Sequence, residues 1–409
     1  MGTRFILRRG FGLRPPVGRI PPPPPLITIQ VRDHSARGTA RAPDGPAIND
    51  ANHSTFRPAR ANITTVSSQA AWPFVGNERS IRALQNAVAG AVQHAYLFTG
   101  PEQTGRATAA RILAQALNCT AETVPCGECA QCRRIASGIH TDVRTVRIEE
   151  TAQDAAARKS ITIEQIREVE VSVALNPYEG RTRVVIIDPA EALSDAAQSA
   201  FLKTLEEPPA HVVFVLICHH ADGVLETIRS RCSRVEFSLV AAAAIEQALL
   251  DRGENPDQAR LLTRLAAGRP GWALAAAADP ASLERRATRL EVARGLPAVS
   301  LAERLATAER MSDAFKRDRE PTLQTLAEWQ AWWRDVLLAQ EGAEEGIANI
   351  DLLDEARADA SLYRRDDVRV FVASLLRTAT LLRENVQSRI ALDALMLDVP
   401  VARVSPAVS

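Results

Sequence analysis

Residues 100 to 107 read Gly-Pro-Glu-Gln-Thr-Gly-Arg-Ala, and this stretch decides the fold. A phosphate-binding loop has two glycines five positions apart, followed by Lys and then Ser or Thr. Gly100 and Gly105 keep the backbone frame that turns amide N–H groups toward phosphate oxygens. Arg106 replaces the Lys that reaches the β- and γ-phosphates, and Ala107 replaces the hydroxyl that holds Mg²⁺. The stretch therefore predicts a nucleotide-binding fold whose phosphate loop is degenerate and inactive.

The segments around the loop have the order that such a loop requires. Residues 95–99 form a short apolar run that ends at the first glycine, and an Ala-rich helical pattern covers 106–117. Before them, apolar residues recur at helical spacing over 79–92. A strand, a glycine loop and a helix in this order predict an α/β domain of the P-loop NTPase type.

Two further strands are expected to end near the loop. The first ends in Asp188, the usual place for an aspartate associated with Mg²⁺, but Pro189 follows where a catalytic Glu would activate water. The second covers 212–218 and is followed by His219 and His220. Two interpretations stay open: these side chains sense a phosphate, or Asp188 caps a turn and the histidines face solvent.

Four of the six cysteines lie close together, in overlapping Cys-x-x-Cys pairs after the Ala-rich helix. Four thiolates close a tetrahedral shell, which makes such a site structural. The softness of the ligands favours Zn²⁺, with an iron–sulfur cluster or two disulfides as the alternatives. The predicted ligands are Cys119, Cys126, Cys129 and Cys132.

The composition suits a globular chain with several domains. The chain has 409 residues, of which 46% are hydrophobic, and its 49 basic residues balance its 49 acidic residues. Such a balance gives no net electrostatic field that would attract nucleic acid or a membrane surface. No apolar run reaches the ~18 residues that are needed to span a bilayer. We expect a cytoplasmic protein. Residues 1–70 are rich in Arg and Pro and predict a disordered extension, with a transit peptide or a basic nucleic-acid-binding arm as alternatives.

After residue 239 the sequence predicts helices almost throughout. Short helical patterns cover 241–251, 256–267 and 270–278, and longer ones cover 298–316, 320–340, 365–383 and 386–397. Trp329, Trp332 and Trp333 share one helix face, which is typical of a core or subunit contact. The predicted domains are an extension (1–70), an α/β domain with the cysteine module (71–238), a small helical lid (239–282) and a helical collar (283–409).

Three strings in this order resemble one family. They are His94-Ala-Tyr-Leu-Phe-Thr-Gly-Pro101, Lys203-Thr-Leu-Glu-Glu-Pro-Pro209 and Ile228-Arg-Ser-Arg-Cys232. Together with the cysteines they resemble the AAA+ clamp-loader family of bacterial DNA polymerase III, with the similarity densest from about residue 72 to 238. The resemblance implies an AAA+ domain with a zinc module, a helical lid and a helical collar.

Within the family, ATPase subunits have an intact loop and subunits of the delta-prime type often have a degraded one, which this sequence resembles. The ATPase subunits also place a phosphate-sensing Arg in the lid, where Gly271 or Trp272 falls here. Arg231 matches the arginine finger that enters a neighbour's ATP site, with Arg229 as the candidate if the register slips. An ordinary surface Arg paired with a carboxylate is the alternative.

The resemblance implies a stator that does not hydrolyse ATP. Its partners would be gamma/tau-type ATPase subunits and a delta subunit in a hetero-pentamer, the sliding clamp, and primed-template DNA reached through the assembly. Bound Zn²⁺ would be structural, and ATP binding to the degenerate loop is doubtful. Two other functions stay open: an AAA+ subunit that itself binds or hydrolyses ATP, and a zinc-dependent nucleic-acid-binding module.

Overall fold

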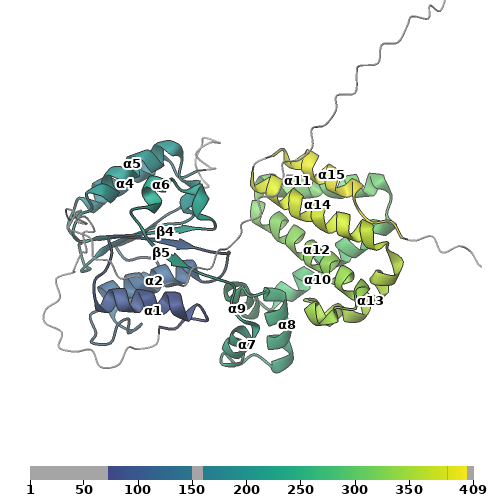
Figure 1. The fold of residues 1–409 in the computed structure, drawn as a ribbon, viewed down its shortest axis with the longest axis horizontal. Helices are drawn as coiled ribbons and strands as arrows, with labels where there is room; N and C mark the ends of the chain where they lie inside the picture. The colour runs from purple at the N-terminus through teal and green to yellow at the C-terminus, as the bar shows by residue number, and fades with distance from the viewer. Residues whose placement is uncertain (1–71, 150–159, 385, 403–409) are drawn as a thin grey trace, which may run out of the picture. The chain divides into compact units, whose positions relative to one another are not determined.

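The computed structural model describes residues 72–149, 160–384 and 386–402 (Figure 1). The extension predicted over residues 1–70 lies outside this part of the chain. Among the described residues, none of the helices combines the length and the apolar character that crossing a bilayer requires.

The α/β region is built on one parallel sheet of five strands in the order β2-β3-β4-β1-β5. The strands are β1 (Ala95–Thr99), β2 (Val143–Val146), β3 (Arg183–Ile187), β4 (Val212–Cys218) and β5 (Ser233–Glu236). Thr99 pairs with Cys218 in register, so the carboxyl ends of the central strands β1 and β4 lie at one level. This edge of the sheet is where the residues after each strand come together.

Helices cover both faces of the sheet (Figure 1). One layer consists of α1 (Glu78–Ala89) and α2 (Arg106–Asn118), and the other of α4 (Ile163–Val173) and α5 (Asp195–Glu206). In β3, Val184 and Ile186 pack into the core on the α2 side. Val185 and Ile187 pack into the opposite core. Burial on both faces explains why these strands are continuous apolar runs instead of alternating ones.

Short elements carry the segments of interest in the α/β region. They are α3 (Ala130–Ala136), η2 (Ala190–Ala192), η3 (Ala221–Gly223) and α6 (Glu226–Arg229). The strands and helices expected from the sequence in this region occur, with ends that differ by up to three residues. Helices α3 and α4 were not among the predictions.

Three short helices follow the sheet and share a small core of their own. They are α7 (Ala242–Leu250), α8 (Pro256–Ala266) and α9 (Pro270–Ala278), at the predicted positions. The core forms around Ile245, Leu249 and Leu262, which are almost fully buried. Pro256 at the first position of α8, with Asn255 as its N-cap, explains the sharp start of that helix.

The last third of the chain is also helical. It contains α10 (Ala281–Gly295), α11 (Leu301–Arg317), α12 (Arg319–Gln340), α13 (Leu353–Leu362), α14 (Arg365–Arg383) and α15 (Ser388–Leu397), with 3-10 turns η4 (Leu296–Ala298), η5 (Glu344–Gly346) and η6 (Ile350–Leu352). Trp329, Trp332 and Trp333 of α12 are at most 1% exposed, which confirms the core prediction. The Trp333 ring lies 5.2 Å from that of Tyr363 and 5.4 Å from that of Phe371, both in edge-to-face contacts.

Candidate functional site

The phosphate loop connects β1 to α2, and both of its glycines have backbone angles that only glycine adopts easily. Gly100 has φ 137° and Gly105 has φ 97°. A Cβ at Gly100 would lie 2.0 Å from the carbonyl oxygen of Phe237, and one at Gly105 would lie 2.5 Å from the Phe74 ring. The loop thus retains the tight backbone path of a phosphate-binding loop.

Arg106, the first residue of α2, turns inward and is only 7% exposed. Its Nη1 donates a hydrogen bond to the carbonyl oxygen of Cys218 at the end of β4. Burial lowers the pKa of Arg106, against the opposing effect of the Glu191 and Asp188 carboxylates. The guanidinium of Arg106 is therefore already hydrogen-bonded within the protein.

A bridge of three side chains joins the loop to the strand ends. The Nε2 of His219 lies 2.9 Å from Glu102 Oε1, and its Nδ1 contacts Glu191 Oε1. The backbone N–H of His219 also donates to Glu191 Oε1, at 2.9 Å. Hydrogen bonds to Glu102 and Glu191 raise the pKa of His219 to about 9, against burial. His219 is thus a cation at neutral pH and not a free loop residue, whereas the adjacent His220 is exposed.

The groups that would hold Mg²⁺ and activate water are not assembled here. Asp188 follows β3, 4.0 Å from the guanidinium of Arg147, and burial raises its pKa. The Ala107 methyl packs against the apolar core beside α2 and offers no ligand. Pro189 has no ionisable group, and the next acid, Glu191, is bonded to His219. The residues present therefore do not fit a hydrolytic Mg²⁺–ATP site.

The predicted sensor position in the helical region is occupied by backbone. The N–H of Gly271 donates to the carbonyl oxygen of Gln103 in the phosphate loop, at 2.9 Å. A Cβ at Gly271 would lie 2.9 Å from the same oxygen. A long cationic side chain at residue 271 would require the loop to move.

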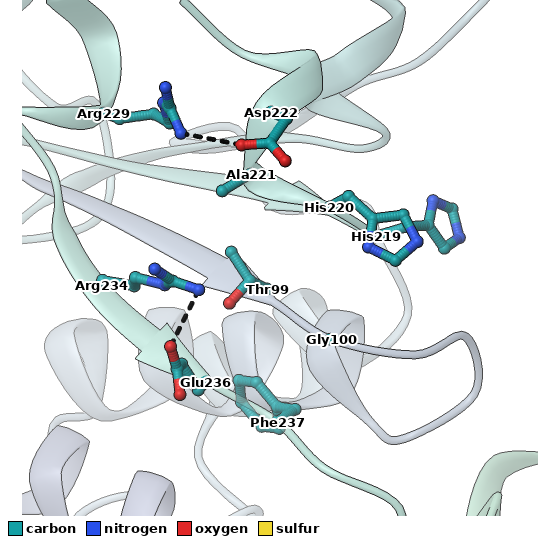
Figure 2. Close-up of a pocket in the computed structure, with 10 residues that line it drawn as sticks. All are labelled: Thr99, Gly100, His219, His220, Ala221, Asp222, Arg229, Arg234, Glu236 and Phe237. Atoms are coloured by element: carbon teal, nitrogen blue, oxygen red, sulfur yellow. Dashed lines mark hydrogen bonds and ion pairs between the residues drawn. The ribbon is translucent and has the colours of Figure 1, made fainter. Parts of the chain in front are cut away.

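A cavity of about 350 Å³ lies beside the loop, at the ends of β1 and β5 (Figure 2). Its lining comprises Thr99, Gly100, His219, His220, Ala221, Asp222, Arg229, Arg234, Glu236 and Phe237. Both arginines are already paired, Arg229 with Asp222 at 3.2 Å and Arg234 with Glu236 at 2.9 Å. The guanidinium of Arg229 thus faces a cavity of its own chain.

Arg231 is directed elsewhere. Its Nη2 lies 2.8 Å from Oε1 of Glu206, the last residue of α5, and its Nη1 donates to the carbonyl oxygen of Thr227 at 2.8 Å. The side chain remains 35% exposed. In the isolated chain Arg231 is a surface arginine with a carboxylate partner, and it does not line the cavity that contains Arg229.

The four clustered cysteines come together as the sequence predicts. Their Sγ atoms all lie within 4.8 Å of one another, and all are free thiols. Backbone N–H groups of Cys126, Cys129 and Cys132 each point at the sulfur of the preceding cysteine, at 3.3–3.4 Å. Burial opposes ionisation of Cys129, but hydrogen bonds from Thr120 and Cys132 lower its pKa to about 6. Four converging sulfurs fit a structural Zn²⁺, which these residues would hold with no open position.

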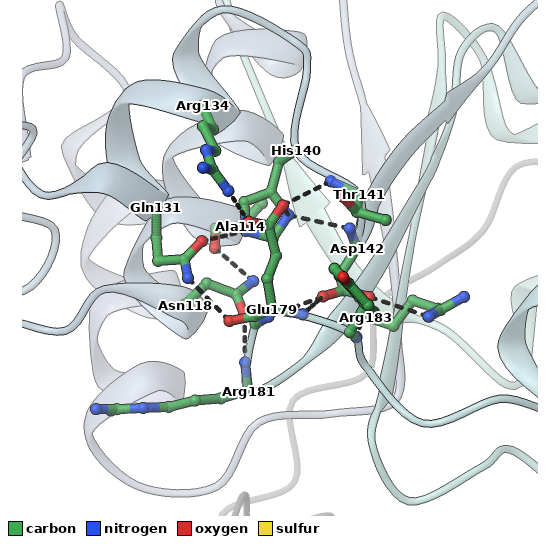
Figure 3. Close-up of polar contacts among 12 residues, drawn as sticks. Ala114, Asn118, Gln131, Arg134, His140, Thr141, Asp142, Glu179, Arg181 and Arg183 are labelled. Atoms are coloured by element: carbon green, nitrogen blue, oxygen red, sulfur yellow. Dashed lines mark hydrogen bonds and ion pairs between the residues drawn. The ribbon is translucent and has the colours of Figure 1, made fainter.

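A polar network surrounds the segment before β3 (Figure 3), and Gln131 of α3 in the cysteine module donates to the carbonyl oxygen of Glu179 in that segment, at 2.8 Å. Asp142, just before β2, is fully buried and accepts hydrogen bonds from the N–H groups of Tyr178, Glu179 and Gly180, each at 2.8 Å. Asn118, the last residue of α2, accepts from the N–H groups of residues 181 and 182. No local sequence pattern predicts this network, because its members are far apart in the chain.

Comparisons with known proteins show what the α/β region is similar to. Residues 76–241 match the family model described as DNA polymerase III, delta subunit. Over 174 residues the chain is 40% identical to DNA polymerase III subunit tau of Bacillus subtilis, covering 42% of this chain and 29% of that protein. It is 32% identical over 194 residues to subunit gamma of Buchnera aphidicola subsp. Schizaphis graminum, covering 46% of this chain and 51% of that protein.

The alignments thus span about half or less of the length of these relatives. The structure also shows a weak likeness, with a TM-score of 0.40 and 16% identity, to a gamma-subunit-related protein of Thermotoga maritima, over 78% of this chain and 97% of that chain. The residues matched by the family model include the sheet, the degenerate loop and the cysteine module. Residues 76–241 are thus similar to the delta, tau and gamma subunits of DNA polymerase III.

Proposed function

We propose that this chain is a non-catalytic stator of the replicative clamp loader, of the delta-prime type, which completes the ring and donates Arg231 to the ATP site of a neighbouring ATPase subunit. The observation that carries the proposal is the inward position of Arg106. Its guanidinium is buried and bonded to the Cys218 carbonyl, where an ATPase needs a free cation for phosphate.

Two further features support the absence of ATP hydrolysis. Ala107 supplies no hydroxyl for Mg²⁺, and Glu191, the acid nearest to Asp188 along the chain, is held by His219. The Glu102–His219 contact also ties the phosphate loop to the residue that follows β4. Each of these features opposes productive nucleotide binding, and together they favour a chain whose nucleotide contact is made in another subunit.

The proposed role of Arg231 follows from charge. A guanidinium placed against the equatorial oxygens of a γ-phosphate stabilises the charge that develops in phosphoryl transfer. Arg231 lies outside the cavity of its own chain and is partly exposed, which suits a group that acts on a neighbour. Arg229 is the weaker candidate, since it is paired with Asp222 inside that cavity.

The proposed assembly is a hetero-pentamer with gamma/tau-type ATPase subunits and a delta subunit. It would open the sliding clamp and place it on primed-template DNA, as part of the polymerase III holoenzyme in the cytoplasm. The cysteine module would contribute a structural Zn²⁺, and residues 239–282 and 283–409 would serve as lid and collar.

Two measurements test the proposal. Titration calorimetry of the full chain with millimolar ATP, with and without Mg²⁺, is expected to give no binding signal. In a loader reconstituted with the ATPase subunits of the same organism, Arg231→Ala is expected to lower DNA-stimulated ATPase and clamp loading by roughly 10³-fold or more at the site it serves. Arg229→Ala is the matched control, and a loss confined to that variant would transfer the finger role to Arg229.

The second candidate is a subunit that itself binds or hydrolyses ATP. The intact glycine path of the loop and the similarity to gamma and tau subunits favour it. Tight, Mg²⁺-dependent ATP binding by the isolated chain would give this candidate the lead.

A further inference from the structure

We propose that Glu206 is a positioning residue for the guanidinium of Arg231, an inference that rests on the finger role proposed above. Arg231 makes two contacts: Nη2 with Glu206 Oε1 and Nη1 with the Thr227 carbonyl, both at 2.8 Å. The two acceptors come from different helices and fix both ends of the fork. A planar guanidinium held at both terminal nitrogens has a defined plane as well as a defined position.

Glu206 is attached to a rigid part of the molecule. It is the last residue of α5, and Phe201, five residues earlier in the same helix, is fully buried. Gln198 of the same helix accepts a hydrogen bond from the N–H of Leu225, at 2.8 Å, at the start of the α6 turn. Because α5 is bonded to the segment that leads to Arg231, the carboxylate and the guanidinium keep their relative placement.

The backbone around Arg231 is fixed as well. Its N–H donates to the carbonyl of Ile228 at 3.0 Å, and the N–H of Cys232 donates to that of Arg229 at 3.2 Å. Because the backbone is fixed, only the side chain of Arg231 still has conformational freedom. The contacts with Glu206 and Thr227 order it before any partner arrives, so little conformational entropy remains to be lost on docking.

The contacts leave the guanidinium able to bind a phosphate. A guanidinium has five N–H groups, and the Glu206 and Thr227 contacts engage only part of this set. The Arg231 side chain is 35% exposed and the Glu206 side chain 53% exposed, so solvent screens the carboxylate charge. The pair can present the free edge of the fork to an oxyanion while its other edge stays anchored.

The neighbouring acid provides a matched control. Glu207 directly follows Glu206 and is also exposed, but it makes no ion pair with any residue that the structure describes. The two acids have the same charge and nearly the same place. Only Glu206 contacts Arg231, so a general effect of surface charge would affect both positions alike.

The experiment uses the full chain in the reconstituted loader and measures kcat and KM of the DNA-stimulated ATPase. We expect Glu206→Ala to lower kcat roughly twofold to fivefold, the range of an exposed ion pair, with KM for ATP unchanged. Glu206→Gln retains an acceptor oxygen and should fall between Glu206→Ala and wild type. Glu207→Ala should match wild type. Thermal unfolding of each variant checks that the fold is intact.

A double variant tests whether Glu206 acts through Arg231. Arg231→Ala combined with Glu206→Ala should be no slower than Arg231→Ala alone, because the positioned group is already gone. An additional loss in the double variant, or a faster ATPase in Glu206→Ala, would overturn the inference. If kcat is unchanged in Glu206→Ala but falls strongly in Arg231→Ala, Glu206 has no positioning role and the finger role of Arg231 stands. No loss in Arg231→Ala removes both the finger and its positioning.

Discussion

The imidazole of His219 lies 2.9 Å from the carboxylate of Glu102 and connects the end of β4 to the phosphate loop. On its other side the same ring contacts Glu191. Two carboxylates that face each other would repel if the ring between them were neutral. The protonated ring therefore ties the phosphate loop to the ends of the strands.

Replacing His219 should give a stability loss that depends on pH. The pKa of His219 in the folded chain is about 9, above the ordinary 6.5. The bridge therefore stabilises the folded chain fully below pH 6.5, and this stabilisation is lost as pH rises through 9. Since the site is partly exposed, we expect His219→Gln to cost about 1 kcal/mol, or ~2–4 °C in Tm, near pH 6.5.

Thermal unfolding from pH 6 to 10 measures this effect. The difference between His219→Gln and wild type should shrink toward pH 10, and the exposed neighbour His220 provides the control variant, His220→Gln. A difference that stays constant over the whole range would rule out the charged bridge.

Arg106→Ala should destabilise the α/β domain. It leaves the Cys218 carbonyl without its donor and removes the positive charge that faces Glu191 and Asp188. We expect a loss of about 2–4 kcal/mol in the free energy of unfolding by urea. Arg111, exposed one turn and a half further along α2, gives the control Arg111→Ala, which should change stability by less than ~0.5 kcal/mol. Equal effects at both positions would contradict the buried role of Arg106.

Metal analysis tests the cysteine module. Plasma mass spectrometry of the purified chain should find one Zn²⁺ per chain, and a strong chelator should remove it and lower Tm. Cys132→Ser should abolish the stoichiometric metal, whereas Cys232→Ser, outside the module, should keep it. Full retention of zinc in Cys132→Ser would refute the four-sulfur site, and iron in place of zinc would change the assignment of the metal.

Asp142→Asn should weaken the contact between the residue before β2 and the segment before β3. Burial alone would raise the pKa of Asp142, but three backbone N–H groups and Arg183 hold it below its usual 3.8. The stabilisation is thus present above pH 3.8 and is lost as pH falls through the depressed value. We expect a loss of about 2–3 kcal/mol at pH 7 that diminishes in acid.

Urea unfolding at several pH values checks this expectation. The control is Glu168→Gln, which removes an exposed ion pair with Arg144 at 2.7 Å and should have little effect. A loss at Asp142 no larger than that at Glu168 would show that the buried carboxylate is not the anchor.

The sequence predicted those features whose causes are local. Gly100 and Gly105 mark the loop because their backbone angles exclude other residues, and the apolar run at 212–218 marks a strand buried on both faces. The cysteine module was also predictable, since Cys-x-x-Cys spacing fixes sulfur positions over a few residues. Each of these signals is contained in a short stretch of the chain.

Contacts between distant residues were not predictable in this way. Glu102, Glu191 and His219 meet because the strand order brings three loops to one edge, and no local pattern encodes that order. Helix α10 was missed for another reason. It buries Arg286, 4% exposed, against Asp351 at 2.8 Å, so a charged residue occupies a position where an apolar residue would have signalled the helix.

Helix α2 begins at Arg106 and ends at Asn118, and both of these residues are buried and bonded to the sheet region. Its 13 residues form a rod of ~20 Å that is fixed at both ends. A rod fixed in this way cannot fray from its termini, the usual route by which helices exchange their amide hydrogens. The amides of α2 should therefore be among the slowest in the chain to exchange with deuterium. The helix then acts as a rigid element between the phosphate loop and the cysteine module.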